Sequence, residues 1–492
     1  MPVLNLWQNN CCRQISFSGT PSLSALLQEH SIHSSHPCGG RGRCGKCAVR
    51  AEGDISLPTA AEKNAGTRLS CQITLLGDAS VWLKENAGLV EVSGSSPVPG
   101  TPMEGRYGAA IDIGTTTIAL KLYDLRTGTL LSEAGAMNPQ RSISADVMGR
   151  IGAAMEGKRA VLQSMVTDAV QELLAHSCAE ANLTLQNVDV LVVTGNTTML
   201  YLLTGRDPSC LAAAPFRADC LFDRWDTLLG IPVYYPPCMN AFVGADITCA
   251  VLDSGICRKA QTGLLCDIGT NGEIALWKDG ALYVASTAAG PAFEGAGISC
   301  GCGSVPGAID RVWTEGGRIH IHTIGEKSAS GLCGSGLVDA IAAFLKTGDI
   351  DETGATEKEV LPLAESVALL PADVRAVQLA KGAIAAGIRT LLELSGTSEA
   401  EIETLYIAGG FGSHLNIPSA AAIGLIPQAL EDRVNVLGNA ALSGAARLLL
   451  DRDLIGTARE LVRQSVSVTL SGSSRFSQHF MEAMLFGSDL FE

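Results

Sequence analysis

A pattern that occurs twice constrains this chain more than any other feature of its sequence. Residues 109–120 (AAIDIGTTTIAL) and 264–276 (LLCDIGTNGEIAL) each read as an apolar strand, an Asp-Ile-Gly-Thr turn and a second apolar strand. The two aspartates, Asp112 and Asp267, are 155 residues apart (267 − 112), which is about the length of one domain. The repeat therefore predicts two related lobes, each presenting one hairpin turn.

Both turns carry groups that can bind phosphate. Backbone N–H groups and hydroxyls in such turns donate to phosphate oxygens. Asp112 and Asp267 would face Mg²⁺, directly or through water, because Mg²⁺ keeps much of its hydration shell. One such hairpin is weak evidence for a nucleotide site, but two at this separation are strong evidence. The residues expected to contact phosphate are Gly114, Thr115, Thr116, Gly269, Thr270 and Asn271.

Two further segments fit the same site. In VVTGNTTML (192–200), Asn196 follows a predicted strand and could orient water or the γ-phosphate. In TLYIAGGFGSHL (404–415), a strand enters a glycine-rich turn that permits close approach to an adenine or ribose. The glycines proposed for this contact are Gly409, Gly410 and Gly412.

Three acidic residues add candidates for chemistry. Asp246 and Glu273 each lie in a glycine-flanked turn with no apolar pattern to explain them, and Glu273 is expected to be catalytic together with Asp112, Asn196 and Asp267. Glu294, in PAFEGAG, is expected to face the nucleotide or a partner.

From Ala109 onward, apolar strands alternate with long amphipathic helices, which predicts an α/β architecture. The clearest helices cover residues 161–175 and 373–394, and the small-residue segment 437–450 predicts a helix start that allows close packing of the lobes. Residues 86–108 are rich in Gly, Ser and Pro and are expected to form a linker. The predicted units are therefore 1–85, the linker 86–108 and 109–492.

Four cysteines near the N-terminus have the spacing of an iron–sulfur site. Cys38, Cys44 and Cys47 lie on one glycine-rich loop, HPCGGRGRCGKC, and Cys71 follows after 23 intervening residues. A [2Fe–2S] centre commonly takes three ligands from one tight loop and the fourth from further along the chain. Zinc is the alternative, although a zinc site usually has paired Cys-x-x-Cys knuckles and does not need intervening glycines. Cys300, Cys302 and Cys333 could suggest a second metal site, but small-residue packing is the commoner role of such cysteines.

Charge and composition exclude several classes of protein. The net charge of −15 argues against a nucleic-acid partner, and no apolar run reaches the 18 residues of a membrane-spanning helix. Sixteen cysteines without a recognisable signal peptide predict a reducing, cytoplasmic location.

The order DIGTTT, TGNTT, DIGTNGE, AGGFG and GNAALSGA resembles the nucleotide-binding superfamily of actin, hexokinase and Hsp70. A longer set of strings resembles the reductive activators of corrinoid proteins, which are ferredoxin-fused ATPases that return inactivated Co(II) corrinoid to Co(I). These strings are NPQRSISADVMGRI (138–151), GNTTMLYLLTG (195–205), FVGADIT (242–248), STAAGPAFEGAGISCG (286–301), CGSGLVDAI (333–341), VQLAKGAI (377–384) and IAGGFGSHLN (407–416).

The resemblance covers nearly the whole chain and implies both fold and function. It implies a β-grasp-like [2Fe–2S] ferredoxin domain followed by a two-lobed actin/Hsp70-like ATPase domain. The implied activity is ATP-dependent transfer of one electron from the cluster to the Co(II) corrinoid of a partner protein. An external low-potential donor would reduce the cluster, Mg²⁺ would accompany ATP, and the chain would form a homodimer. In this sequence Gly301-Cys302-Gly303-Ser304 is unusual after the AFEGAG string, and the chain is short between the cluster loop and the ATPase.

Three alternatives remain from the residues alone. The chain could activate another low-potential metalloenzyme, such as a radical dehydratase, although those activators usually hold a [4Fe–4S] cluster between subunits. It could be a small-molecule kinase with an attached redox domain. It could also be an ATP-regulated binding module whose cluster is only structural.

Overall fold

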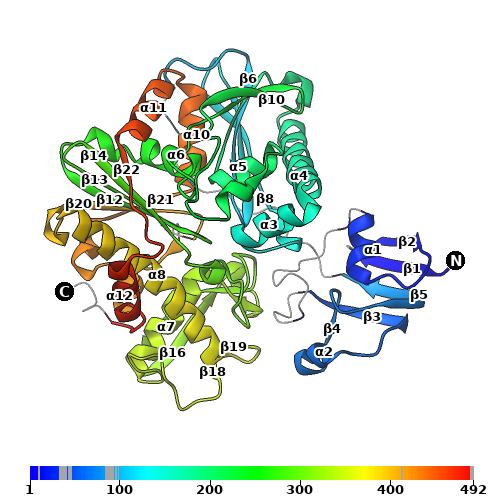
Figure 1. Ribbon diagram of the computed structural model, residues 1–492. Coiled ribbons are helices and arrows are strands. Elements are labelled where there is room, and N and C mark those ends of the chain that lie inside the picture. Colours follow the sequence, from blue (N-terminus) through cyan, green and yellow to red (C-terminus); the bar gives the residue numbers. More distant parts are fainter. Residues whose placement is uncertain are drawn as a thin grey trace.

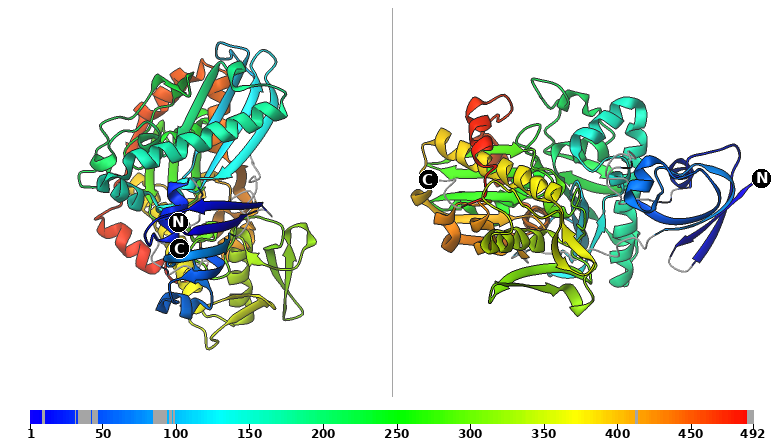
Figure 2. Two further views of the ribbon diagram at one scale, coloured as in Figure 1. Left: turned by 90° about the vertical axis from the view of Figure 1, so that its right-hand side faces the viewer. Right: turned by 90° about the horizontal axis from the view of Figure 1, so that it is seen from below.

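The computed structural model describes residues 1–8, 11–30, 32, 42, 47–83, 94, 97, 99–411 and 414–487. Within these ranges, the chain forms a small N-terminal unit beside a larger two-lobed body (Figure 1). The view from below in Figure 2 shows the blue strands of the small unit projecting beside the cyan helices of the body. None of the described helices combines the length and the apolar character needed to cross a membrane.

The N-terminal unit is a five-stranded mixed sheet in the order β2-β1-β5-β3-β4. Its central pair, β1 and β5, is parallel, and the other pairs are antiparallel. Alternate apolar residues of the sheet, such as Leu4 and Leu6, pack with Leu23 and Leu27 of α1. This arrangement confirms the predicted β-grasp-like fold. The elements are β1 (Val3–Gln8), β2 (Cys11–Ser16), α1 (Leu23–Glu29), β3 (Ala48–Ile55), α2 (Ala60–Ala65), β4 (Arg68–Leu69) and β5 (Leu75–Trp82).

Lobe I of the body contains a six-stranded sheet in the order β10-β11-β9-β6-β7-β8. β6, β7 and β8 form an antiparallel meander, and β9 joins β6 in parallel. One face of this sheet packs against α4, whose buried residues include Leu162, Val166 and Val170. The elements are β6 (Tyr107–Ile113), β7 (Thr117–Asp124), β8 (Thr129–Met137), α3 (Val147–Ala153), α4 (Arg159–Glu180), β9 (Val190–Gly195), α5 (Thr197–Leu203), β10 (Arg224–Leu228), β11 (Ile231–Tyr235) and α6 (Ala245–Ser254).

Lobe II repeats this plan with a sheet in the order β21-β20-β12-β13-β14-β22. β12, β13 and β14 form the meander, and β20 joins β12 in parallel. The outer face packs against α7 and α8. The elements of the sheet and its helices are β12 (Thr262–Ile268), β13 (Gly272–Lys278), β14 (Ala281–Thr287), α7 (Gly334–Thr347), α8 (Pro371–Ser395), β20 (Ile402–Ala408), α9 (Ile417–Ala422), β21 (Val434–Gly438), α10 (Ala440–Leu450), α11 (Leu454–Gln464), β22 (Ser465–Ser467) and α12 (Ser474–Glu482).

Two helices pack between the sheets and join the lobes. α6 and α10 lie against each other, in one apolar core with residues from both sheets. A Cβ at Gly444 of α10 would lie 2.0 Å from the carbonyl oxygen of Cys249 in α6, so only glycine allows this crossing. The predicted close packing at residues 437–450 is confirmed.

A smaller sheet, β16-β15-β17, and the hairpin of β18 and β19 extend lobe II. Their bounds are β15 (Ala308–Glu315), β16 (Arg318–Thr323), β17 (Gly331–Leu332), β18 (Leu361–Ala364) and β19 (Val367–Leu369). The two helices expected at residues 161–175 and 373–394 are present as α4 and α8, and each extends beyond the expected range at both ends.

The end of the predicted linker is attached to the body. β6 begins at Tyr107, two residues before the expected start of the domain at 109. Before it, Gly100 and Met103 donate backbone hydrogen bonds to the end of α10, at Leu450 and Leu449, and the side chain of Met103 is buried. These contacts place residues 99–106 on the body, because a buried methionine in a Gly/Pro-rich segment anchors it.

Candidate functional site

Cys47 and Cys71 come together at one edge of the N-terminal unit. Cys47 lies in the turn before β3 and Cys71 in the turn after β4, and their sulfurs are 3.2 Å apart. The Cys47 thiol donates to the Cys71 sulfur, which raises the pKa of Cys47 and lowers that of Cys71 to about 6. Hydrogen bonds from the Gln72 side chain and the Gly42 backbone lower the pKa of Cys71 further. Sulfurs held in contact and surrounded by N–H donors are suited to bind iron as thiolates.

The turn that carries Cys71 is held by a buried carboxylate. Thr59 and Glu62 form a capping box at the start of α2, and Glu62 also accepts hydrogen bonds from Leu69 N and Arg68 Nε at 3.0 and 2.9 Å. These bonds fix β4 directly before Cys71. Gly42 has a φ of +69°, and a Cβ there would lie 3.0 Å from Ala61, so the predicted need for glycine in this loop is supported at this position.

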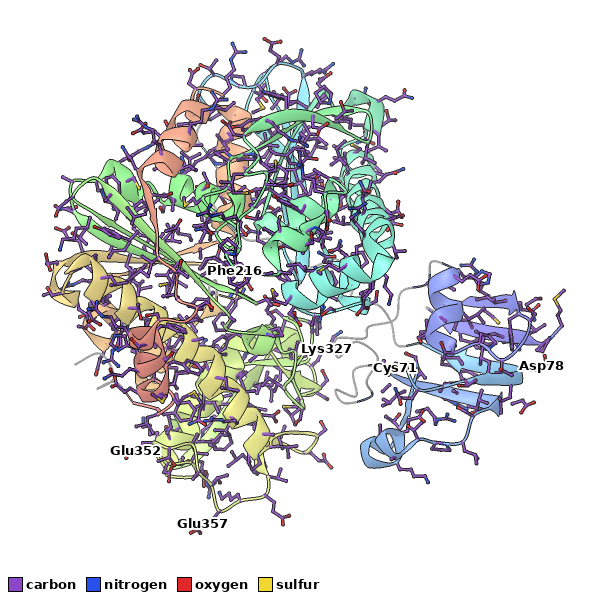
Figure 3. All side chains as sticks on the ribbon, in the orientation of Figure 1. Cys71, Asp78, Phe216, Lys327, Glu352 and Glu357 are labelled. Carbon is purple, nitrogen blue, oxygen red and sulfur yellow. The ribbon has the colours of Figure 1, made fainter. Side chains whose placement is uncertain are left out.

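The other two predicted ligands, Cys38 and Cys44, lie outside the described residues. Figure 3 shows Cys71 on the side of the N-terminal unit nearest the body, and Asp78 on the opposite side. Cys71, whose sulfur contacts that of Cys47, therefore lies on the side of the unit that faces the body.

In the body, the two Asp-Ile-Gly-Thr turns meet across the lobes. The hydroxyl of Thr116 in lobe I lies 3.1 Å from that of Thr270 in lobe II. Glu294 Oε2 accepts hydrogen bonds from both hydroxyls, with Thr270 Oγ1 at 2.9 Å. Glu294 ends the short helix η6 (Pro291–Glu294) after β14. The fold thus brings together the two turns that the repeat predicted, with a carboxylate between them.

The acidic candidates form one electrostatically coupled group around these turns. Burial raises the pKa of Asp112 to about 6, and a hydrogen bond from Asn439 opposes part of this shift. Burial and the charges of Asp112 and Glu294 raise the pKa of Asp267 to about 7. Burial and the charges of Asp112 and Asp267 raise the pKa of Asp246 to about 8. Such a group attracts cations and gives up its protons when one binds.

Glu273 belongs to the same group and is 6% exposed. Its pKa is raised well above the ordinary value by burial and by the charges of Asp246 and Asp267. Ser286 Oγ donates to it at 3.2 Å. Across the described residues, no three His, Cys, Asp or Glu side chains converge where they could hold a metal ion together. A Mg²⁺ at this site would therefore take most of its ligands from water and phosphate oxygens.

Asn196 and Asn439 each follow a strand and cap the next helix, one in each lobe. Asn196 follows β9 and caps α5, with its amide nitrogen 3.0 Å from Thr115 Oγ1. Asn439 follows β21 and caps α10, with its amide nitrogen 3.0 Å from Asp112 Oδ2. Both polar atoms of Asn196 are bonded within lobe I, so its amide positions Thr115, and its expected role toward water or the γ-phosphate stays a prediction.

Sequence reasoning did not single out Asn439, Arg141 or Arg150. Asn439 carries the signal of a helix cap, since it stands between a strand and a run of small helical residues. The two arginines lie in one segment that follows β8, and nothing in their local pattern separates them from surface arginines.

Arg150 lies directly behind the lobe I turn and is fully buried. Its guanidinium donates to Thr115 O at 2.5 Å, Gln140 Oε1 at 3.1 Å and Ser144 O at 3.0 Å. Burial and the charge of Arg141 lower the pKa of Arg150 to about 9. Asn138, at the start of η1 (Pro139–Ser142), also holds the turn in place. Its side-chain amide donates to Gly114 O at 2.9 Å, and its backbone N–H donates to Thr116 O at 2.8 Å.

The glycine-rich turn after β20 lies beside the lobe II aspartate. Gly409 has a φ of +99°, and a Cβ there would lie 2.9 Å from Asp267 Oδ1. Gly409 therefore lies close to the neighbouring strand, and its expected approach to an adenine or ribose stays a prediction. A Cβ at Gly410 would meet no atom within 4 Å, and Gly412 lies outside the described residues. The next residue, Phe411, stacks on Phe293 of η6, with ring centroids 5.1 Å apart.

Comparison with family models divides the chain into three consecutive parts. Residues 13–76 match the "2Fe-2S iron-sulfur cluster binding domain", residues 107–259 match the "RACo middle region", and residues 261–491 match the "C-terminal domain of RACo the ASKHA domain". These matches agree with the fold: a ferredoxin unit, then lobe I, then lobe II.

Individual relatives of this chain agree with the matches to the family models. The corrinoid activation enzyme RamQ of Eubacterium limosum is 33% identical over 422 residues, which are 78% of this chain and 71% of RamQ. The [Co(II) methylated amine-specific corrinoid protein] reductase of Methanosarcina barkeri is 25% identical over 417 residues, 76% of each chain. Among solved structures, a reductive activator for corrinoid,iron-sulfur protein superposes with a TM-score of 0.73 and 26% identity, covering 100% of this chain and 99% of that one.

Proposed function

Since the chain belongs to the family of reductive activators of corrinoid proteins, we propose that it uses ATP to reduce the Co(II) corrinoid of a partner protein to Co(I). The observation that carries this proposal is the pairing of two sites on one chain. Cys47 and Cys71 are in sulfur contact in a ferredoxin fold, and the two phosphate-type turns meet across the lobes of an ASKHA fold.

The residues present suit a [2Fe–2S] cluster, which Cys38, Cys44, Cys47 and Cys71 would hold. When bound, the cluster supplies one electron at a time, which is the amount that the conversion of Co(II) to Co(I) consumes. Glu62 and Gly42 keep the Cys71 turn in place, and Gln72 donates to the Cys71 sulfur.

In the body, the proposed role of the turns is to bind the phosphates of ATP. Thr116 and Thr270 present hydroxyls from opposite lobes, so a ligand that bonds to both stabilises the closed arrangement. Asp112, Asp246, Asp267 and Glu273 supply the negative charge for a hydrated Mg²⁺. Asn196, Asn138 and Arg150 position the lobe I turn.

Energy coupling is needed because a low-potential acceptor opposes the transfer. For one electron, about 60 mV of unfavourable potential difference corresponds to about 1.4 kcal/mol. A deficit of a few hundred millivolts therefore costs on the order of 5–10 kcal/mol. Closure around ATP contributes only if the closed form favours a different docked state of the partner.

Four finer statements belong to the same proposal. Mg²⁺ accompanies ATP, an external low-potential donor reduces the cluster, the active form is a homodimer, and the protein works in the cytoplasm. The described cysteines form no disulfide with one another, which suits a reducing compartment.

The proposal is tested by mixing the reduced protein with Co(II) corrinoid protein, with and without ATP, and following the absorbance of Co(I). Wild type should form Co(I) in an ATP-dependent way. Cys71→Ser should abolish it, whereas Cys12→Ser, at an exposed cysteine of β2, should leave it unchanged. An ATP-independent rate in wild type would contradict the proposal. In addition, a [4Fe–4S] signal from electron paramagnetic resonance of the reduced protein would favour an activator of a different enzyme.

A further inference from the structure

Glu294 occupies the point where the two lobes would share a phosphate. One oxygen, Oε2, accepts from Thr116 of lobe I and from Thr270 of lobe II. These hydroxyls are 3.1 Å apart, so a single anionic oxygen reaches both. A carboxylate and a phosphate are both anions that accept charge-assisted hydrogen bonds, and they compete for the same two donors.

We propose that Glu294 is an internal anion that the terminal phosphate of ATP displaces, and that Arg141 receives this phosphate. This inference rests on the proposed function, since it concerns how the same site distinguishes ATP from ADP. A nucleoside diphosphate lacks the group that would take the place of the Glu294 carboxylate. ATP therefore has to move Glu294, whereas ADP can bind with Glu294 still bonded to both threonines.

The position of Arg141 supports its part in the proposal. It lies in η1, the short helix that Asn138 fixes to the lobe I turn. Its guanidinium is partly buried and makes no hydrogen bond or ion pair with any described residue. Burial lowers the pKa of Arg141, and the charge of Glu294 opposes this shift, which places the two side chains in one electrostatic environment. A planar guanidinium in this setting matches phosphate well.

Displacement of Glu294 would move more than one side chain. Phe293, the preceding residue of η6, stacks on Phe411. A Cβ at Gly334, the first residue of α7, would lie 1.9 Å from Phe293 O. A Cβ at Gly295 would lie 2.6 Å from Cys302 O. Since η6 is packed this tightly, a shift of Glu294 must be passed on to α7 and to the segment of Cys302.

The test compares the affinity for the non-hydrolysable analogue β,γ-imido-ATP with that for ADP, by calorimetry at fixed Mg²⁺. Glu294→Gln removes the charge at nearly constant size and should tighten binding of the analogue about tenfold, equivalent to about 1.4 kcal/mol, while ADP changes less than about threefold. Arg141→Gln should weaken binding of the analogue by a similar factor and should weaken binding of ADP by less. Glu315→Gln at the exposed end of β15 and Arg126→Gln in the exposed turn after β7 are matched controls.

Two results would overturn the inference. The first is a ratio of analogue to ADP affinity that Glu294→Gln leaves unchanged or lowers. The second is unchanged binding with a large fall in kcat for ATP hydrolysis, because Glu294 would then act on the attacking water. Thermal unfolding of each variant checks that it is folded. Thr270→Val removes one hydrogen-bond partner of Glu294. In that background, Glu294→Gln should therefore change the affinity for the analogue less than it does in wild type. Failure of the proposed function is a separate outcome, in which wild type binds neither nucleotide.

Discussion

The two Asp-Ile-Gly-Thr hairpins have the same backbone plan but different side chains around it. In lobe I, Asp112 pairs across the hairpin with Ala119, whereas in lobe II Asp267 pairs with Glu273. Residues opposite each other in an antiparallel pair share a face, so lobe II places a second acid beside its aspartate. Lobe II is the acidic side of the site.

The turns are also supported differently. The carbonyl of Thr115 accepts from the buried guanidinium of Arg150, whereas the carbonyl of Thr270 accepts from the backbone N–H of Gly290 at 2.9 Å. At this carbonyl, lobe I uses a cation and lobe II a neutral backbone N–H. The two copies of a repeated fold can therefore play different roles in one site. Here lobe I supplies a cationic support for its turn, and lobe II supplies additional carboxylates.

The largest expected effect is a loss of stability caused by a substitution in lobe I. Arg150→Met leaves the acceptors at Thr115, Gln140 and Ser144 without their donor. Each buried unsatisfied group costs about 1–3 kcal/mol, so the variant should lose about 3–5 kcal/mol of stability. Thermal unfolding measures the loss, and Arg159→Met, at the exposed start of α4, is the control. If both variants unfold at the temperature of wild type, Arg150 does not support the turn.

A second prediction compares the two aspartates by their pH dependence. Both have pKa values raised by burial, to about 6 for Asp112 and about 7 for Asp267. The folded state therefore holds these protons more tightly than the unfolded state, and without Mg²⁺ its stability should fall as pH rises from about 4 through these values. At pH 8, Asp267→Asn should raise the free energy of unfolding by about 2 kcal/mol and Asp112→Asn by about 1 kcal/mol. Both values are reduced from the full effect of the pKa shifts because the two side chains are partly exposed to solvent.

Thermal unfolding at pH 5 and pH 8, without Mg²⁺, measures these differences. Equal recovery by the two variants would contradict the proposed asymmetry between the lobes. Restoring Mg²⁺ should reduce the pH dependence of wild type, since a bound cation stabilises the ionised carboxylates.

The smallest expected effect is a difference in pH dependence between substitutions of Asn196 and of Asn439. Asn196→Ala and Asn439→Ala each remove a helix cap and should each cost about 1 kcal/mol. Only Asn439→Ala also removes a hydrogen bond to a carboxylate, that of Asp112, so only this variant should raise the pKa of Asp112 further and steepen the fall of stability with pH. The same pH series checks this, and equal slopes for the two variants would show that the cross-lobe bond has no electrostatic effect.

Much of this organisation could be predicted from residues that are close in sequence. The hairpins, α4 and α8 follow from local apolar periodicity and from turn residues. The spacing of Cys47 and Cys71 predicted sulfurs that meet, and the structure places them 3.2 Å apart. The small-residue segment 437–450 was expected to allow close packing of the lobes, and the approach of Gly444 to Cys249 confirms it.

Other features depend on residues that are distant in sequence. The Asn439–Asp112 bond joins positions 327 residues apart, and Thr116 meets Glu294 only because the lobes close on each other. No local pattern distinguishes Arg150 from a surface arginine, since its burial depends on Thr115, Gln140 and Ser144 being folded around it. The two hydrogen bonds that Asn196 makes within lobe I, to Thr115 and from Met199, also depend on this fold, and its expected role toward water or the γ-phosphate stays a prediction.

The sequence by itself determined the repeated hairpins, the spacing of the cysteines and the alternation of strands and helices, because each depends on the conformations available to a few neighbouring residues. The tertiary structure alone decided which turn is cationic, which is acidic and which anion lies between them. Those properties come from burial and from charges brought together across the lobes, and neither exists until the chain has folded.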